Sequence, residues 1–107
     1  MPIMFAYSVI CQFTGQSPRE TAAAWLAWLK HHHLADVIAA GAETAEVVTW
    51  DGEPLTMEVR YRFPSRELFA EYERDHAPRL RAEGLQLFPP EQLGLIFRRQ
   101  TGEIMRT

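Results

Sequence analysis

The chain has 107 residues, a formal net charge of −3 and 23% charged residues. This length is typical of one domain, spanning residues 1–107, and a hydrophobic fraction of 47% supports a packed core and argues against global disorder. Binding to nucleic acid needs clustered Lys and Arg, whereas this chain has a single lysine and no basic block. We therefore expect no nucleic-acid partner.

The cellular location follows from cysteine content and hydropathy. One cysteine, Cys11, excludes an internal disulfide and fits a reducing compartment. The apolar N-terminal stretch lacks the basic start and small-residue cleavage site of a signal peptide. No apolar run approaches the ~18 residues that span a bilayer. We expect a cytoplasmic protein without a membrane partner.

The first third of the chain predicts a strand and a helix. Residues 4–13 alternate and are rich in aromatic and β-branched side chains, which favours a strand. Ser17 then precedes Pro18, and Glu20 completes a capping-box pattern, so a helix begins here. The helix continues, or breaks and restarts, until Gly41 ends it. At about 100° per residue, one apolar stripe gathers Ala22, Trp25, Leu26, Leu29 and His33.

A β-hairpin follows. Residues 42–50 predict a second strand, and Asp51-Gly52 is a strong turn signal. The third strand starts near residue 55 and includes the sequence MEVRYRF, which has two opposed faces. Its apolar face carries Met57, Val59, Tyr61 and Phe63, and its polar face carries Thr56, Glu58, Arg60 and Arg62.

The last third predicts helices and a final strand. Ser65 caps a helix, Pro78 forces a boundary, and a short second helix ends at Gly84. Residues 85–92 then form a loop, and residues 94–100 form the last strand. The apolar stripe of the first of these helices is Leu68, Phe69, Tyr72 and His76.

The element order is βαββαβ, which predicts an α+β fold of the ferredoxin-like type. Both helices then lie on one face of a four-stranded antiparallel sheet with spatial order 4-1-3-2. The apolar stripe of strand 3 and Phe5, Tyr7, Val9 and Phe13 of strand 1 face the helices. The other face gathers Met4, Ala6, Ser8, Ile10, Glu58, Arg60, Arg62, Ile96 and Arg98.

This second face is too apolar for water and too charged for a dry core. We therefore expect a homodimer formed through the open sheet face, in which Glu58 of one copy pairs with Arg60 or Arg62 of the other. In the alternatives, the face is left to solvent in a monomer, or its charges line a wet lumen.

Three segments carry a resemblance to a known family: WLAWLKHHHLADVIAAG, YRFPSRELFAEYERDHAPRLRAEGLQLF and FRRQTGEI. They resemble a bacterial domain-of-unknown-function family of small proteins, and HAPRLRAEGL is the most specific part. This family is similar to the dimeric α+β barrel superfamily, which includes stress-responsive barrel proteins, cofactor-free monooxygenases and muconolactone isomerase. The resemblance implies a dimer but no activity. The short hairpin at residues 51–54 departs from relatives with a ligand-gating loop.

Two histidines are the candidate catalytic groups. His33 and His76 lie on apolar helix stripes and match histidines of the family pattern. Their imidazoles, with an ordinary pKa near 6.5, face the space between helices and sheet and act as bases there, or they simply order the fold through backbone hydrogen bonds. The ligand-binding candidates are the aromatic residues nearby and one arginine: Tyr7, Trp25, Tyr61, Tyr72 and Arg60.

The remaining notable side chains are expected to have structural roles, with one binding alternative. Arg60, Arg62 and Arg98 with Glu58 bind a carboxylate or phenolate in the dimer lumen, or form a charge ladder that fixes dimer register. Cys11 is a small core residue, and Arg79, Arg81 and Glu83 form a solvated helix face. Trp28, at the margin of its stripe, and Trp50, at the hairpin tip, are two candidates for an exposed contact with a partner. No metal site is expected, since ligand-spacing motifs are lacking, and no cofactor, since there is no glycine-rich phosphate loop.

The sequence therefore leaves three functions open. The preferred one is a homodimer that binds a small apolar or aromatic molecule or serves as an accessory module. The second is a cofactor-independent enzyme of the monooxygenase or isomerase type, with His33 or His76 as proton acceptor. The third is a structural or protein-interaction dimer. A cavity between helices and sheet separates these functions.

Overall fold

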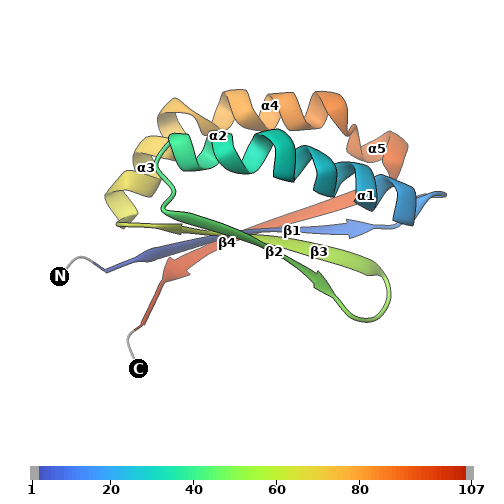
Figure 1. Ribbon diagram of the computed structural model, residues 1–107, viewed down its shortest axis with the longest axis horizontal. Helices are drawn as coiled ribbons and strands as arrows, with labels where there is room; N and C mark the ends of the chain where they lie inside the picture. Colours follow the sequence, from blue (N-terminus) through green and yellow to red (C-terminus); the bar gives the residue numbers. More distant parts are fainter. Residues whose placement is uncertain (1–2, 106–107) are drawn as a thin grey trace.

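A computed structural model describes residues 3–105 and has one antiparallel sheet covered by helices on one side (Figure 1). The strands follow the order β2-β3-β1-β4, so the expected order 4-1-3-2 is confirmed. The elements are β1 (Phe5–Phe13), α1 (Pro18–Trp28), the π-helical turn η1 (Leu29–His33), α2 (Leu34–Ala39), β2 (Thr44–Trp50), β3 (Leu55–Phe63), α3 (Arg66–Asp75), α4 (Ala77–Leu87), α5 (Pro90–Leu93) and β4 (Leu95–Glu103).

The core lies between the central strands and the helices. Strand alternation places every second residue of β1 and β3 on the helix side, as predicted. Aromatic rings dominate this core, with centroid separations between 5.0 Å (Tyr7–Phe69) and 6.2 Å (Tyr7–Tyr72). Such tilted ring pairs add stability beyond the area they bury. The largest side chains with almost no exposure are Tyr72, Phe5, Phe63, Leu29 and Leu80.

The two predicted helix caps differ. Ser65 has an extended backbone, and its hydroxyl accepts a hydrogen bond from the Leu68 amide at 3.2 Å, so this cap is confirmed. The capping box at Ser17 is wrong, because its side chain makes no capping hydrogen bond. Its backbone angles (φ −127°, ψ 63°) depart from the extended conformation that aims a cap side chain at the helix. Pro18 does occupy the first helical turn.

The first helical segment contains a π-helical turn. In η1 the Leu34 amide donates to the carbonyl of Leu29, five residues earlier, and helix geometry continues into α2. The helix thus neither runs on as a plain α-helix nor breaks. Gly41, with φ +131°, comes directly after the C-cap residue Ala40, which confirms it as the terminator.

The segment after Pro78 differs from the prediction. Gly84 does not end a helix, since α4 runs through it to Leu87, and part of the expected loop at 85–92 is helical in α4 and α5. A Cβ on Gly84 would lie 3.0 Å from Cη2 of Trp28, so this glycine permits close packing between α1 and α4. The last strand is also longer than expected and extends to Glu103.

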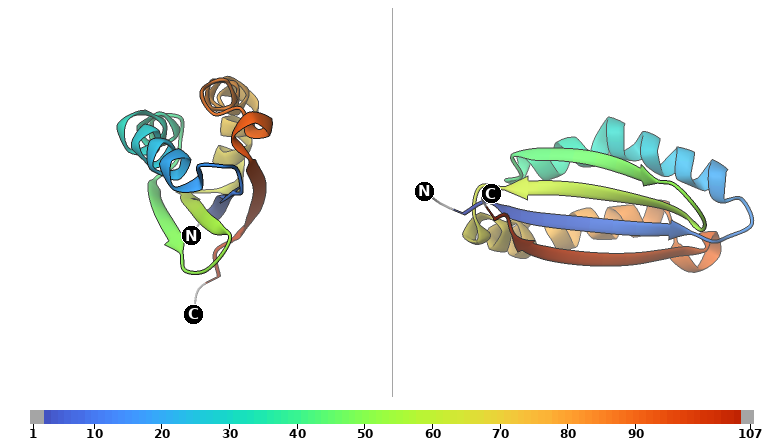
Figure 2. Two further views of the ribbon diagram at one scale, coloured as in Figure 1. Left: turned by 90° about the vertical axis from the view of Figure 1, so that its right-hand side faces the viewer. Right: turned by 90° about the horizontal axis from the view of Figure 1, so that it is seen from below.

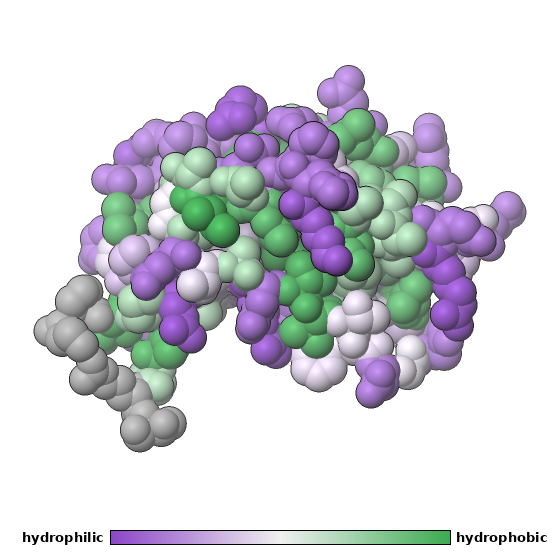
Figure 3. All heavy atoms as spheres, in the orientation of Figure 1, coloured by the Kyte–Doolittle hydropathy of each residue, from purple (hydrophilic) through white to green (hydrophobic). Residues whose placement is uncertain are grey.

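The helices lie only on one side of the sheet, and the other side is uncovered (Figure 2). Seen along the strands, the segment α1–α2 and the segment α3–α5 stand apart above the sheet (Figure 2). Hydrophobic side chains gather where the first helical segment meets β2, while hydrophilic ones cover the helix tops (Figure 3). The cavity described next lies between these two helical segments and the sheet.

Candidate functional site

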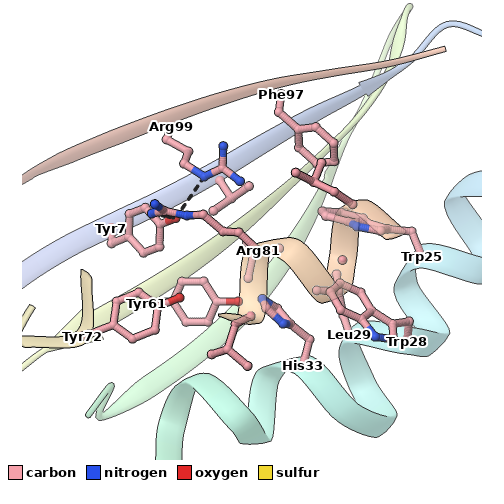
Figure 4. Close-up of a pocket in the computed structure, with 15 residues that line it drawn as sticks. Tyr7, Trp25, Trp28, Leu29, His33, Tyr61, Tyr72, Arg81, Phe97 and Arg99 are labelled. Atoms are coloured by element: carbon pink, nitrogen blue, oxygen red, sulfur yellow. Dashed lines mark hydrogen bonds between the residues drawn. The ribbon is translucent and has the colours of Figure 1, made fainter. Parts of the chain in front are cut away.

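A cavity with a volume of about 50 Å³ lies between the two helical segments and the sheet (Figure 4). Strands β1, β3 and β4 form its floor, and residues of α1, η1, α3 and α4 form its walls. Aliphatic side chains such as Val59 and Leu80 fill the gaps between the rings. Six aromatic residues line it: Tyr7, Trp25, Trp28, Tyr61, Tyr72 and Phe97.

One end of the cavity is cationic. The hydroxyl oxygen of Tyr7 accepts hydrogen bonds from Nη2 of Arg81 at 3.1 Å and from Nε of Arg99 at 3.2 Å. Nη2 of Arg81 also donates to Oε1 of Glu73 at 2.8 Å. Burial alone would lower the pKa of Arg81, but its hydrogen bonds to Glu73 and Tyr7 outweigh this and raise it. Arginine side chains keep their charge in proteins, so two positive charges meet at this end of the cavity.

His33 lies in the cavity wall and is uncharged at neutral pH. Its imidazole is half-buried and stacks on the indole of Trp28 with ring centroids 4.4 Å apart. Burial lowers the pKa of His33 from 6.5 to about 4, Asp36 raises it in part, and Arg99 lowers it further. The expectation of an unperturbed pKa near 6.5 is thus wrong, since the predicted value ignored desolvation of the imidazolium.

Tyr61, Tyr72 and Cys11 are protonated at neutral pH. Burial raises the pKa of Tyr61 and of Tyr72 above their ordinary value, and the neighbouring tyrosines add to this. Burial also raises the pKa of the Cys11 thiol to about 12. Since the thiolate is the reactive form, Cys11 is an inert core residue, as its position on the helix-facing side of β1 predicted.

The two candidate histidines are not brought together. His33 lines the cavity, whereas His76 lies outside it, at the junction of α3 and α4. The backbone amide of His76 donates to the Tyr72 carbonyl at 3.0 Å, and its carbonyl accepts from the Leu80 amide at 3.1 Å. Within residues 3–105 neither imidazole makes a side-chain hydrogen bond.

The predicted ligand-binding residues divide between the two faces of the sheet. The four aromatic ones, Tyr7, Trp25, Tyr61 and Tyr72, all line the cavity. Arg60 lies on the opposite, open face, where it borders a separate hollow. It belongs with the charges of that face and not with the aromatic cavity.

Sequence reasoning missed several cavity residues, and four of them matter most: Arg81, Arg99, Trp28 and Gly84. Arg81 is not on a solvated helix face; its side chain is 30% exposed and bonded to Tyr7. Trp28 is not a partner contact, because it packs on His33 and against α4. The signals were present: Arg99 continues the Leu95–Phe97 alternation, and Arg81 falls on the buried stripe of α4 four residues after Ala77.

On the open face, the Glu58 carboxylate is paired by side chains of its own chain. Its carboxylate accepts hydrogen bonds from Nε of Arg60 at 3.1 Å and from Nε1 of Trp50 at 3.0 Å, and the residue is only 6% exposed. Burial raises the pKa of Glu58, but hydrogen bonds from Arg60, Ser8 and Trp50 outweigh burial, so the pKa is lowered overall. Glu58 therefore needs no arginine from a second copy, and Trp50, although 47% exposed, already binds within the chain.

Two further properties bear on function. Among residues 3–105, no group of three His, Cys, Asp or Glu side chains is placed to hold a metal ion. No helix in that range is long and apolar enough to cross a membrane. The chemistry available in the cavity is thus that of aromatic surface, hydroxyl groups, one neutral imidazole and two guanidiniums.

The fold defines a ferredoxin-like α+β protein with two helical segments on one face of its sheet. The chain belongs to the family described as "Domain of unknown function (DUF4286)", whose model matches residues 7–103. This confirms the resemblance to a domain-of-unknown-function family. No protein with a curated description matches the chain at a significant level.

Solved structures share this fold at low sequence identity. A dimeric ferredoxin-like protein from an uncultured marine organism is 11% identical, with 98% of each chain covered and a TM-score of 0.69. A dimeric ferredoxin-like protein of unknown function from Thermobifida fusca is 13% identical, covering 97% of this chain and 93% of its own, at a TM-score of 0.68. The hydroxynitrile lyase from Passiflora edulis is 13% identical, with 100% of this chain and 98% of its own chain covered and a TM-score of 0.67. At these identities the similarity shows the fold alone.

Proposed function

We propose that the protein is a homodimer that binds a small apolar or aromatic molecule in the cavity between its helices and its sheet. The observation that carries this proposal is the lining: six aromatic rings surround a space at one end of which Arg81 and Arg99 converge on the Tyr7 hydroxyl. Ligand sites typically combine a mostly apolar wall with a few convergent polar groups. A cytoplasmic location is part of the proposal and fits the single, unpaired cysteine.

The size of the cavity limits the ligand. Its volume of about 50 Å³ is well below the roughly 150 Å³ of an apolar cavity that holds benzene. A short aliphatic group fits directly, whereas an aromatic ring requires the Trp28 or Arg81 side chain to move outward. Both side chains lie at the edge between the helical segments and are partly exposed, so such a movement leaves the central core in place.

The enzymatic alternative has weaker support. A general base works best when its pKa lies near the working pH, and the pKa of His33 is about 4. His76, the other candidate base, lies outside the cavity. The hydroxynitrile lyase among the similar structures shows that this fold accommodates an enzyme, but it shares 13% identity with the chain.

The homodimer is supported by two independent observations. Structures with the same fold are described as dimeric ferredoxin-like proteins. The open sheet face also carries half-buried apolar side chains beside the Glu58–Arg60 pair, and Ile96 is exposed there. Light scattering at micromolar concentration is expected to give twice the chain mass of 12.3 kDa, and a mass equal to one chain contradicts the dimer.

Ligand binding is tested by tryptophan fluorescence. Trp25 and Trp28 line the cavity, whereas Trp50 lies on the other face, so the Trp50→Phe variant reports on the cavity alone. Titration with butanol and with phenol is expected to change its emission saturably. Val9→Phe, which fills the cavity, should abolish the change.

Thr49→Phe is the matched control, because it adds the same ring at an exposed position of β2. This variant should still respond to both probes. Saturable responses that persist in Val9→Phe contradict binding in the cavity. No response to either probe in the parent protein contradicts the proposal for these two ligand classes.

A further inference from the structure

The geometry points to a monocarboxylate with a short apolar body as the ligand, with its carboxylate held by Arg81 and Arg99 at the cavity mouth. This inference rests on the proposed function, because it names the chemistry of the ligand for the same cavity. It starts from the convergence of two guanidinium groups within 3.2 Å of one phenol oxygen, that of Tyr7 (Figure 4).

The charge at the mouth is not balanced by the protein. Arg81 is paired with Glu73, but no carboxylate among residues 3–105 forms an ion pair with Arg99. His33 is neutral at pH 7 because of its lowered pKa. The mouth therefore carries one net positive charge. Two like charges that approach one neutral hydroxyl repel each other, and an anion between them relieves this repulsion.

The hydrogen-bond donors at the mouth are also incompletely used. A guanidinium has five N–H donors in a planar fork, and Arg99 donates only through Nε to another side chain of the described residues. Nε of Arg81 is buried and has no partner within residues 3–105. A planar carboxylate accepts two parallel hydrogen bonds from such a fork, which makes it the best-matched anion for this pair.

The cavity beyond the mouth selects the rest of the ligand. Arg99 is exposed, whereas Val59, Leu80 and Tyr61 are buried, so a carboxylate bound by Arg99 faces outward and the rest of the ligand lies against buried side chains. The interior offers aromatic and aliphatic surface and about 50 Å³, which accepts a short apolar chain. A second carboxylate would meet no cation there, so dicarboxylates are excluded by the cost of burying an unpaired charge.

The test compares acids with their neutral amides by isothermal titration calorimetry at pH 7 and low salt. The probes are butyrate against butyramide and benzoate against benzamide, which are nearly identical in shape. Charge-assisted hydrogen bonds from two guanidiniums should make each acid bind at least about tenfold tighter than its amide. Arg99→Gln should remove most of that preference, since it deletes the unpaired charge.

Arg98→Gln is the matched control, because Arg98 is the adjacent residue of β4 and lies on the opposite face of the sheet. It should keep the full preference for the acids. Arg81→Lys keeps the charge but loses the fork, and it should weaken acid binding several-fold while amide binding stays constant. Circular dichroism melts confirm that each variant is folded before it is titrated.

The outcomes separate this inference from the proposed function. Equal binding of acids and amides overturns the carboxylate inference and leaves a ligand-binding cavity in place. An acid preference that survives Arg99→Gln but disappears in Arg98→Gln also overturns it, because the anion then binds to the open face. Absence of binding by both acids and both amides overturns the inference, and absence of butanol and phenol binding as well removes the proposed function.

Discussion

The buried imidazole of His33 makes stability depend on pH in a defined window. Its pKa is lowered from 6.5 to about 4, so the folded protein binds this proton less readily than the unfolded chain. The stabilisation is therefore complete above pH 6.5 and is lost progressively as the pH falls toward 4. Below pH 4 both states are protonated and no further loss arises from this residue.

The magnitude follows from linkage. With these two pKa values, the free energy of unfolding falls by up to about 2 kcal/mol between pH 7 and pH 5. Acidic side chains stay largely ionised over this range, since their ordinary pKa values are about 4. The Glu58 carboxylate, with its lowered pKa, loses its own contribution only at more acidic pH.

Urea denaturation at pH 7, 6 and 5, at one fixed protein concentration, measures the effect. His33→Gln should lose up to about 2 kcal/mol less stability over this range than the parent protein, because glutamine does not titrate. His31→Gln is the control, since His31 is exposed on the same π-helical turn, and it should behave like the parent. A His33→Gln variant with the parent's pH dependence would refute the reasoning.

Three further predictions concern the glycines, the open face and the thiol. Gly94→Ala should destabilise the protein by more than about 2 kcal/mol, because Gly94 has φ +69° and an added Cβ would lie 2.4 Å from a backbone nitrogen. Gly102→Ala is its control, and it should change the melting temperature little, because the space around Gly102 is free. Trp50→Phe removes a hydrogen-bond donor from the buried Glu58 carboxylate and should cost about 1 kcal/mol in urea denaturation; no loss would show that this bond contributes nothing. Cys11 should react with Ellman's reagent only after unfolding, and rapid labelling of the native protein would contradict its burial.

Local patterns predicted the sheet and its order because each element follows them consistently. Alternation along residues 57–63 assigns both faces of β3, and its strand pairing confirms the assignment. Ser65 caps its helix because its backbone is extended, so one local signal suffices there. The four aromatic residues Tyr7, Trp25, Tyr61 and Tyr72 could be grouped in advance because each lies on a helix-facing or sheet-facing stripe.

What could not be predicted depends on how two helices lie against each other. His33 and His76 occupy apolar stripes of different helices, and periodicity does not define their relative position along the sheet. Gly84 has the character of a helix terminator, yet it remains helical because the Trp28 ring lies over it. Arg81 belongs to the cavity for the same reason, since only the approach of α4 to β1 brings it to the Tyr7 hydroxyl.

The π-helical turn η1 determines which face of α2 points toward the sheet. It holds one more residue per hydrogen-bonded ring than an α-helical turn, so Leu29 and Val37, eight residues apart, both point into the core. Deleting one residue among 30–32 would restore ordinary winding and leave Leu29 and Val37 seven residues apart, a spacing that an α-helix keeps on one face. Val37 would then still point into the core, so η1 accommodates one extra residue without turning α2 away from the sheet.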